Sequence, residues 1–358
     1  MTRRDLPTRP TRRGVLKLLS GAAIGGLAGC AGDGTDDDTP TARPTGTATP
    51  DETTPTGTTP GDGTPTTGVT PTEGSTPGTD TSTATPTRTA TPPWDAGVIR
   101  AMSFNIRYDN PDDDPPWSDR RERVVEAIDD VSPDVVGLQE ALPGQFSYLR
   151  DRLEGYAWYG VGRYGGDEGE HTPLGWRSDR FEAVDRGTFW LSETPDEPGS
   201  VGWNADLPRI ASWVDLESRT GDLRFRTYST HFSHVSPEAR ENSSRLLRER
   251  IEDRLVDRRM SILLGDFNFE PGSAAHQELT KSGLVDARQV AAEVEGPEGT
   301  FQEGLGGGEP GRRIDYVFLP INVPVVRFRT LPPAETLRSD HLPVVADVDR
   351  DTVEETFG

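Results

Sequence analysis

The chain has 358 residues, which is enough for one large domain or two of ordinary size. Its 60 acidic and 38 basic residues give a formal net charge of −22, and Cys30 is the only cysteine. A single cysteine excludes an intramolecular disulfide. Lys17 and Lys281 are the only lysines. This acidic, lysine-poor composition is typical of proteins adapted to molar salt, where the screening length falls to about 3 Å. Net acidity therefore does not exclude an anionic substrate.

Residues 1–30 have the features of an export signal. Arg12 and Arg13 precede an apolar run that is too short to cross a bilayer as a stable span, and small residues precede Cys30. The paired arginines resemble a twin-arginine signal, and Leu27 to Cys30 resemble a lipoprotein-processing box. We expect a lipid on Cys30 that tethers the exported protein to the outer face of the membrane. The alternative for Cys30 is a small buried apolar residue.

Residues 31–93 are almost entirely Thr, Pro, Gly, Ser and Asp, with repeated Thr-Pro units. Such a segment cannot bury enough apolar surface to offset the entropy of ordering, so we expect a disordered linker. It acts either as a stalk, which O-glycans on threonine can decorate, or as a passive connection. We expect the folded domain at residues 94–350, followed by a tail at 351–358.

The pattern of residues predicts a domain of strands with interspersed helices. A strand is expected at residues 98–106, and a helix at 118–131 has Ser118 as its N-cap. A short buried strand follows at 134–140, and two further helices are expected, a long one at 237–256 and a shorter one at 273–281. The later strands are expected at 209–217, 223–232, 260–267, 312–319, 323–331 and 342–348. This order favours an α/β or α+β domain with two packed sheets.

Polar residues collect at the ends of these strands, where ligands meet sheet proteins. They are Asn105, Glu140, Asp266, Asn268, Asp340 and His341. Carboxylate and amide oxygens suit a hard cation such as Mg²⁺ or Mn²⁺. Zinc is disfavoured, because no cysteine is nearby and we expect His231 and His234 to face opposite sides of a strand end.

Six motifs identify a family resemblance over Val98 to Asp349. They are MSFNIRYD, LQE, STHFSHVSPEAR, GDFN, RRIDYVF and SDHLPV, in this order. Together they resemble the endonuclease/exonuclease/phosphatase superfamily, and further segments such as GTFWLSETPDEPGS resemble a secreted, lipoprotein-like branch of it. The resemblance implies a DNase-I-like four-layer sandwich, in which two packed β-sheets are flanked by helices. It also implies metal-dependent hydrolysis of phosphate esters by a single in-line attack of water.

The resemblance assigns roles to individual residues. Glu140 matches the principal metal carboxylate, Asn105 the amide beside it, and Asp340 a further metal ligand. Asp266 matches the aspartate that deprotonates the attacking water, next to Asn268. Asp315 matches the partner of His341, and His341 matches a histidine that contacts the phosphate. His231 matches a second histidine facing the phosphate, and Glu170 matches a carboxylate partner.

Each residue also has a structural alternative. Asn105 and Asn268 suit turns or caps, and Glu140 suits the first turn of a helix. Asp315 is also a candidate ion-pair partner of a neighbouring arginine. His234 is either a supporting residue or a surface residue, and we expect His276 on a helix surface with no role. Asn242 begins a glycosylation sequon within a predicted helix.

The substrate class stays open at this stage. A phosphodiester, including extracellular nucleic acid, is the first expectation, and Arg107, Arg163, Arg209 and Trp203 are candidates to contact its backbone. The alternative is a phosphomonoesterase acting on sugar, inositol or lipid phosphates. A different class is a non-catalytic binding protein at the cell surface. We expect a monomer.

Overall fold

The computed structural model describes residues 97–256, 260–281, 283–334 and 337–357. The expected signal at 1–30, including Cys30, and the expected linker at 31–93 lie outside the described residues. No helix in the described part of the chain combines the length and the apolar composition that crossing a membrane requires.

The first sheet contains seven strands in the described residues, in the order β10-β12-β13-β1-β2-β4-β3. Their bounds are β10 Glu293–Glu295, β12 Val325–Thr330, β13 Val344–Asp349, β1 Val98–Asn105, β2 Val135–Gln139, β4 Leu174–Arg177 and β3 Tyr156–Tyr159. β1 and β2 run parallel, with Asn105 opposite Gln139. The carboxyl ends of both strands therefore lie at the same edge of the sheet.

The second sheet contains six strands in the described residues, in the order β5-β6-β7-β8-β11-β9. Their bounds are β5 Phe181–Trp190, β6 Ile210–Ser218, β7 Arg224–His231, β8 Met260–Asp266, β11 Asp315–Pro320 and β9 Leu284–Asp286. β7 and β8 run parallel and place His231 opposite Asp266. β11 is antiparallel to β8 and places Asp315 opposite Asp266.

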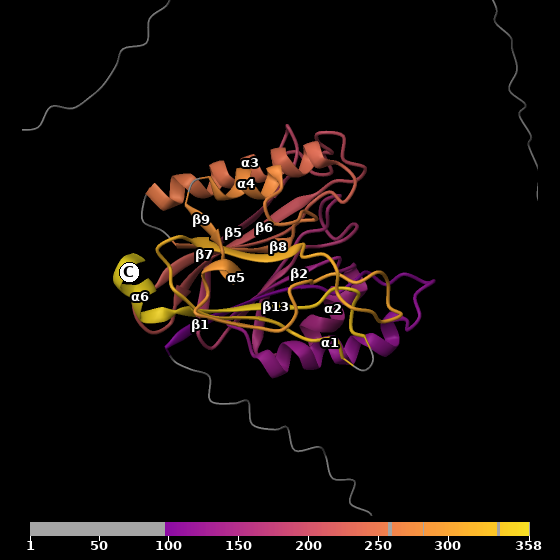
Figure 1. Ribbon diagram of the computed structural model, residues 1–358, viewed down its shortest axis with the longest axis horizontal. Helices are drawn as coiled ribbons and strands as arrows, with labels where there is room; N and C mark the ends of the chain where they lie inside the picture. The colour runs from indigo at the N-terminus through magenta and orange to yellow at the C-terminus, as the bar shows by residue number, and fades with distance from the viewer. Residues whose placement is uncertain (1–96, 257–259, 282, 335–336, 358) are drawn as a thin grey trace, which may run out of the picture. The chain divides into compact units, whose positions relative to one another are not determined.

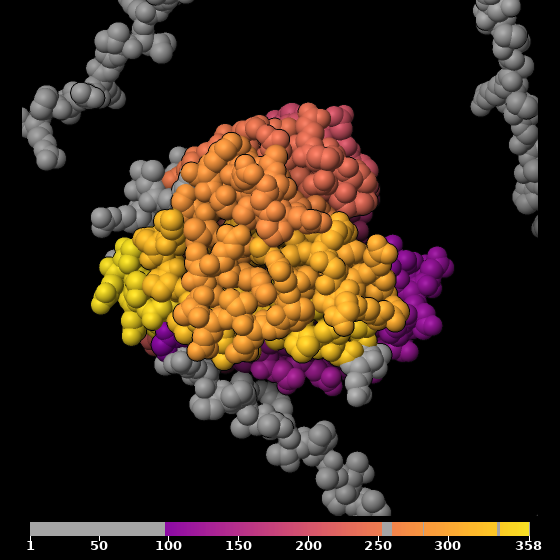
Figure 2. All heavy atoms as spheres, viewed as in Figure 1, coloured from indigo at the N-terminus to yellow at the C-terminus, as the bar shows by residue number. Residues whose placement is uncertain are grey.

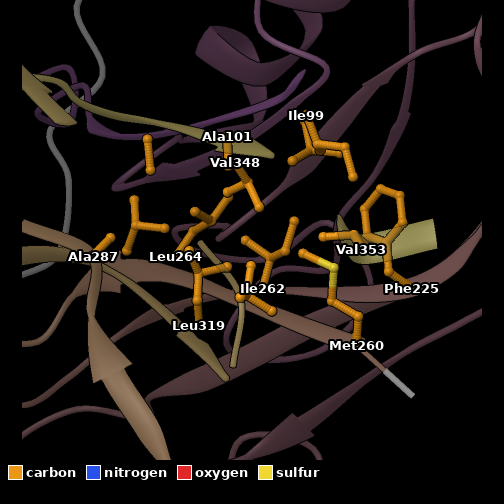
Figure 3. Packing of buried hydrophobic residues seen from close by; sticks show 14 of the residues in the cluster. Ile99, Ala101, Phe225, Met260, Ile262, Leu264, Ala287, Leu319, Val348 and Val353 are labelled. Atoms are coloured by element: carbon orange, nitrogen blue, oxygen red, sulfur yellow. The ribbon is translucent and has the colours of Figure 1, made fainter. Parts of the chain in front are cut away.

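The main hydrophobic core lies between the two sheets, because both contribute their inward-facing apolar side chains to one buried cluster. Ile99 from β1 and Leu264 from β8 are fully buried members of this cluster (Figure 3). The sheets approach each other closely at Gly137 in β2, where an added Cβ atom would lie 2.9 Å from the Ser229 Oγ and 3.0 Å from the Leu264 Cβ. Only glycine fits this contact without movement of its neighbours.

Helices cover the outer faces of both sheets, which confirms the four-layer sandwich (Figure 1). The helices α1 (Trp117–Val131) and α2 (Pro143–Arg152) pack on the first sheet, where Ile128 and Leu149 join buried residues of β1 and β2. The helices α3 (Pro237–Val256) and α4 (Ala274–Thr280) pack on the second sheet. Figure 2 shows that later segments of the chain, coloured orange to yellow, cover most of the face turned to the viewer.

Three local expectations were wrong. Ser118 does not cap α1: the helix begins at Trp117 after Pro116, and the Ser118 hydroxyl bonds to Asp119 instead. Residues 351–358 were expected as a tail, but 351–357 belong to helix α6 (Arg350–Phe357), whose Val353 is fully buried in the core between the sheets. His276 is buried rather than exposed, because α4 turns it toward the aromatic rings of Tyr316 and Phe318.

The remaining helix in the described residues is the short α5 (Ala287–Val290) after β9. The sequence did not predict α2, α5 or α6, nor the strands β3, β4, β5, β9 and β10. The long helix α3 has the expected bounds. α4 begins one residue after Ser273, whose hydroxyl accepts a hydrogen bond from the His276 backbone N–H and caps the helix.

Candidate active site

The predicted site residues meet where strands of the two sheets end. Asn105 ends β1, Glu140 follows β2, and Asp266 ends β8. Because β1 is parallel to β2 and β7 is parallel to β8, each pair delivers its polar residues to one edge. Contacts between β1 and β8 then bring the two edges together across the core. The sandwich itself therefore assembles the site.

Asn105 connects the carboxylates at the centre of the site. Its fully buried side-chain Nδ2 atom donates to the Glu140 Oε1 at 2.9 Å and to the Asp266 Oδ2 at 3.0 Å. Its Oδ1 atom accepts from the backbone N–H of Arg107 at 3.0 Å, which fixes the amide orientation. In this arrangement the amide nitrogen of Asn105, and not its oxygen, faces the two carboxylates.

Asp266 is a buried carboxylate with unusual acid–base character. Burial raises the pKa of Asp266 to about 7; the nearby cation on His341 opposes the rise and the charge of Asp315 adds to it. Its Oδ1 atom accepts from the backbone N–H of Asn268 at 3.0 Å. The Asn268 side chain donates to the Phe232 carbonyl at 3.1 Å, so both groups are held side by side.

His341 forms a buried pair with Asp315. The His341 Nδ1 atom lies 2.9 Å from the Asp315 Oδ2, and its Nε2 atom lies 3.7 Å from the Asp266 Oδ2. Burial opposes the charged form of His341, but Asp315 and then Asp266 outweigh burial and raise its pKa to about 10. His341 is therefore a cation at neutral pH, and the alternative of Asp315 as an ordinary partner of a neighbouring arginine does not describe this contact.

Asp340 lies beside the site and forms an ion pair with Arg107. The Asp340 Oδ2 lies 2.7 Å from the Arg107 Nη1, and the same guanidinium contacts both carboxylate oxygens of Asp113. Ser339 bonds to Asp340 and to the backbone oxygen of Asn105, which joins this segment to the end of β1. The described residues thus present Asp340 as an ion-pair partner, whereas the sequence expectation makes it a metal ligand.

The two neighbouring histidines have different environments. The buried His231 Nε2 lies 3.3 Å from the Asp266 Oδ2. Burial, and then the cation of Arg209, lowers the pKa of His231 well below its ordinary value, so its ring is neutral. His234 is exposed and contacts Arg209 and Asp206. The two histidines therefore lie in different surroundings, one buried and one exposed.

Glu170 lies in a group of charged residues next to Glu140. The Glu170 Oε2 pairs with the Arg163 Nη1 at 2.9 Å. Burial and the charge of Glu140 raise the pKa of Glu170, while Arg163 and Arg209 oppose the rise. Glu140, Glu170, Arg163, Arg209 and His231 together line a small space of about 10 Å³.

Several residues of the site have a left-handed backbone, which is costly for residues with large side chains. The φ angles are 55° at Arg107, 62° at Glu140 and 51° at Asn268. Such strain costs on the order of 1–3 kcal/mol for a residue and persists where surrounding contacts impose it. Contacts of this kind hold Glu140, because its carboxylate accepts hydrogen bonds from the Asn105 side chain and from the backbone N–H of Tyr108. Glu140 is therefore held by these two contacts and lies outside any helix.

The donor set fits a hard divalent cation. Oxygen atoms of Glu140 and Asp266 and a ring nitrogen of His341 lie within 4.8 Å of one another. A protonated histidine does not coordinate a metal, so the two carboxylates are the ligands that this group offers. Carboxylate oxygens are ligands that hard divalent cations prefer.

The sequence interpretation did not assign a role to Thr300. Its hydroxyl accepts from the backbone N–H groups of Ile314 and Asp315, at 3.0 and 3.1 Å, and so fixes the start of β11. Phe301 packs beside the His341 ring with 5.0 Å between ring centroids. Both residues belong to the segment GPEGTF at residues 296–301.

This constellation has the composition of a metal-dependent phosphoesterase. The model of the Endonuclease/Exonuclease/phosphatase family matches residues 102–341, so the chain belongs to this family. The motif-based resemblance is therefore confirmed, and the activity class that the family defines is the hydrolysis of phosphate esters.

Solved structures of two bacterial proteins have the same fold. An endonuclease/exonuclease/phosphatase from Bacteroides vulgatus is 38% identical, with a TM-score of 0.67 over 70% of this chain and 98% of that chain. A mannosyl-6-phosphatase from Bacteroides thetaiotaomicron is 30% identical, with a TM-score of 0.66 over 70% of this chain and 99% of that chain. An uncharacterized protein of Acanthamoeba polyphaga mimivirus is 26% identical over 162 residues, 42% of this chain, and the chain spans 59% of that protein's length.

Proposed function

We propose that this protein is a divalent-metal-dependent phosphomonoesterase that acts on small phosphorylated metabolites, with sugar phosphates as the first substrate class. The observation that carries this proposal is the unequal size of two spaces that border the site, one at Asn268 and the other at Glu140. A groove of about 630 Å³ begins at Asn268 and runs along the N-terminal ends of α3 and α4. The space that Glu140 and Arg209 line is only about 10 Å³.

The unequal space favours a monoester for a steric reason. A phosphate diester carries two organic groups on the phosphorus atom, whereas a monoester carries one. The groove at Asn268 accommodates a leaving group of the size of a sugar, and the space at Arg209 accommodates an oxygen atom. The likeness to a mannosyl-6-phosphatase supports the same substrate class.

The residues of the site supply the chemistry of phosphoryl transfer. Glu140 and Asp266 would hold a divalent cation, which would supply polarisation of a phosphoryl oxygen and neutralisation of charge in the transition state. The Asp266 carboxylate accepts a proton from the attacking water, and the neighbouring Asn268 helps to orient that water. The His341 cation, held by Asp315, stabilises negative charge on the phosphate oxygens.

A second candidate is the phosphodiesterase that the sequence favoured, including a nuclease. Arg240 and Arg312 line the groove at Asn268, and neither has an ion pair with a carboxylate among the described residues. Two such cations suit the second phosphate of a nucleic acid strand. Glu238, Glu241 and Glu270 line the same groove and repel a strand of phosphates, so this candidate comes second.

The location of the activity follows from the sequence expectations. We propose that the protein is exported by a twin-arginine signal, anchored by a lipid on Cys30 to the outer face of the cell membrane, and monomeric. The motifs at residues 11–30 and the Thr/Pro-rich segment support this location. A phosphatase at the cell surface releases phosphate and a neutral alcohol from external esters.

The test compares four substrates with purified protein in molar KCl with Mg²⁺ or Mn²⁺. They are p-nitrophenyl phosphate, mannose 6-phosphate, bis-p-nitrophenyl phosphate and plasmid DNA. Hydrolysis of the two monoesters at a rate at least about 100-fold above the diesters supports the proposal. Cleavage of the diesters or the plasmid alone supports the second candidate. Metal binding without turnover of any ester, in the protein and in Asp266→Ala alike, supports the non-catalytic binding protein.

A further inference from the structure

Arg209 is a buried cation that no described carboxylate pairs with at ion-pair distance. The residue lies directly before β6 and only 6% of its surface is exposed. Its Nη2 atom contacts the His234 Nδ1 at 3.0 Å, and its Nε atom has no hydrogen-bond partner in the described part of the chain. A buried guanidinium normally has an ion pair or several acceptors, because removing it from water is costly.

The surroundings of Arg209 place it next to the reacting centre. Arg209 lines the same small space as Glu140 and His231, and His231 in turn lies 3.3 Å from Asp266. Arg163 borders this space as well; Glu170 holds its Nη1, and its Nε atom also has no partner among the described residues. Two guanidinium groups thus keep unused donors near Glu140, one of the two carboxylates that suit a metal.

We propose that Arg209, supported by Arg163, binds the non-bridging oxygens of the substrate phosphate and selects monoesters over diesters. This inference rests on the proposed function, because it names the residues that give the same site its preference. A phosphate monoester carries up to about two negative charges and three terminal oxygens. Guanidinium groups match such oxygens with paired, charge-assisted hydrogen bonds.

The preference follows from charge and from size. A diester offers one negative charge and replaces one terminal oxygen with an ester oxygen and its organic group. A space of about 10 Å³ between Arg209 and Glu140 admits an oxygen atom and excludes an organic group. The guanidinium of Arg209 therefore gains a partner from a monoester, and it keeps an unpaired donor when a diester binds.

A structural role is the competing explanation for Arg209. In this explanation, its contact with His234 only fixes the segment before β6 to the segment after β7. His234→Ala removes that contact and keeps the guanidinium, so it separates bracing from phosphate binding. Arg186→Gln is the matched control, because Arg186 is an exposed arginine on β5.

The experiment measures kcat/KM of the full-length protein for p-nitrophenyl phosphate and bis-p-nitrophenyl phosphate, which share one leaving group. We expect Arg209→Gln to lower the monoester value at least about 100-fold and the diester value less than about 10-fold. Arg209→Lys keeps the charge, so its kcat/KM for the monoester should lie between the values of the parent and of Arg209→Gln. Arg186→Gln and His234→Ala should keep the monoester-to-diester ratio within about 3-fold of the parent, because both retain the Arg209 guanidinium.

Direct binding of inorganic phosphate to the metal-loaded protein, measured by calorimetry, provides a second readout. We expect Arg209→Gln to weaken phosphate binding at least about 10-fold while the affinity for Mg²⁺ stays unchanged. An equal loss on both esters, an unchanged ratio, or unchanged phosphate binding overturns the role of Arg209. A parent protein that hydrolyses no monoester overturns the proposed function and this inference together, whereas an active parent with an unchanged ratio overturns the inference alone.

Discussion

The His341 Nδ1 atom lies 2.9 Å from the Asp315 Oδ2 across the junction of β11 and the segment before β13. Both side chains are almost fully buried, and the backbone of Asp315 is fixed by the Thr300 hydroxyl. The carboxylate therefore sets the ring orientation of His341 and turns its Nε2 atom toward Asn105 and Asp266.

Replacing Asp315 should weaken catalysis by removing the charge on His341. Asp315→Asn keeps the shape of the side chain but lowers the pKa of His341 from about 10. We expect kcat to fall about 100-fold at neutral pH, a typical cost of losing one electrostatic stabiliser of the transition state. The alkaline limb of the pH–rate profile should move to lower pH, because the His341 ring then loses its proton at a lower pH. Asp185→Asn, an exposed change on β5, is the control. An alkaline limb that does not move contradicts this role.

Asp266 should make metal binding depend on pH. The pKa of Asp266 near 7 in the folded protein lies above the value of about 3.9 in an unfolded chain. The folded, metal-free protein therefore binds this proton more tightly, and its free energy of unfolding falls as pH rises from about 4 to about 7. Removing metal with a chelator should expose this loss.

A bound cation favours the charged carboxylate and reverses the effect. Millimolar Mg²⁺ should raise the melting temperature more at about pH 8 than at about pH 5.5, with proton release on binding near neutral pH. Differential scanning fluorimetry measures the first, and calorimetry in buffers of different ionisation enthalpy measures the second. Asp266→Asn should abolish this pH dependence. If Mg²⁺ raises the melting temperature of the parent protein equally at both pH values, Asp266 does not control metal binding in this way.

The strands that alternate or carry long apolar runs could be predicted from the sequence. The buried run that ends at Asp266 and the alternating strand that ends at Asn105 have clear boundaries, and acids or amides at such boundaries indicated a site. β3 and β4 are only four residues long, and their glycine and charged neighbours leave no period to detect. Their pairing depends on the sheet and not on local preference.

The finer arrangement of the site depends on contacts that no local pattern records. The pairing of Asp340 with Arg107 joins residues that are 233 positions apart in the chain. The neutral state of His231 follows from its burial beside Arg209, which lowers its pKa, although its neighbour His341 is charged. A residue type and its spacing indicate which groups can react, but only the fold decides which of them carries a charge.

Gly137 should be essential for the spacing of the two sheets. A Cβ atom at this position would lie 2.9 Å from the Ser229 Oγ and 3.0 Å from the Leu264 Cβ. We expect Gly137→Ala to lower the free energy of unfolding by about 1–3 kcal/mol, the usual cost of overpacking a core. Urea denaturation measures this change. Gly155→Ala is the control, because an added Cβ atom there meets nothing within 4 Å. Equal stability of both variants would show that the sheets adjust.

Asp340 provides the test that separates an ion-pair partner from a metal ligand. Its carboxylate lies 2.7 Å from the Arg107 Nη1, and the Asp340 side chain is 7% exposed. If this pairing is its main role, Asp340→Asn and Arg107→Gln should each destabilise the protein. The loss of unfolding free energy in the double variant should then be smaller than the sum of the two single losses, by a coupling energy of about 0.5–3 kcal/mol.

Metal affinity is the second readout for this pair. We expect the Mg²⁺ concentration for half-maximal activity to change less than about 3-fold in Asp340→Asn, because Glu140 and Asp266 supply the charged ligands. Glu140→Gln is the positive control and should raise that concentration at least about 10-fold, since it removes one of those charges. A rise of similar size in Asp340→Asn, with no coupling to Arg107, would instead make Asp340 a metal ligand, and Arg107 would then leave its carboxylate when the cation binds.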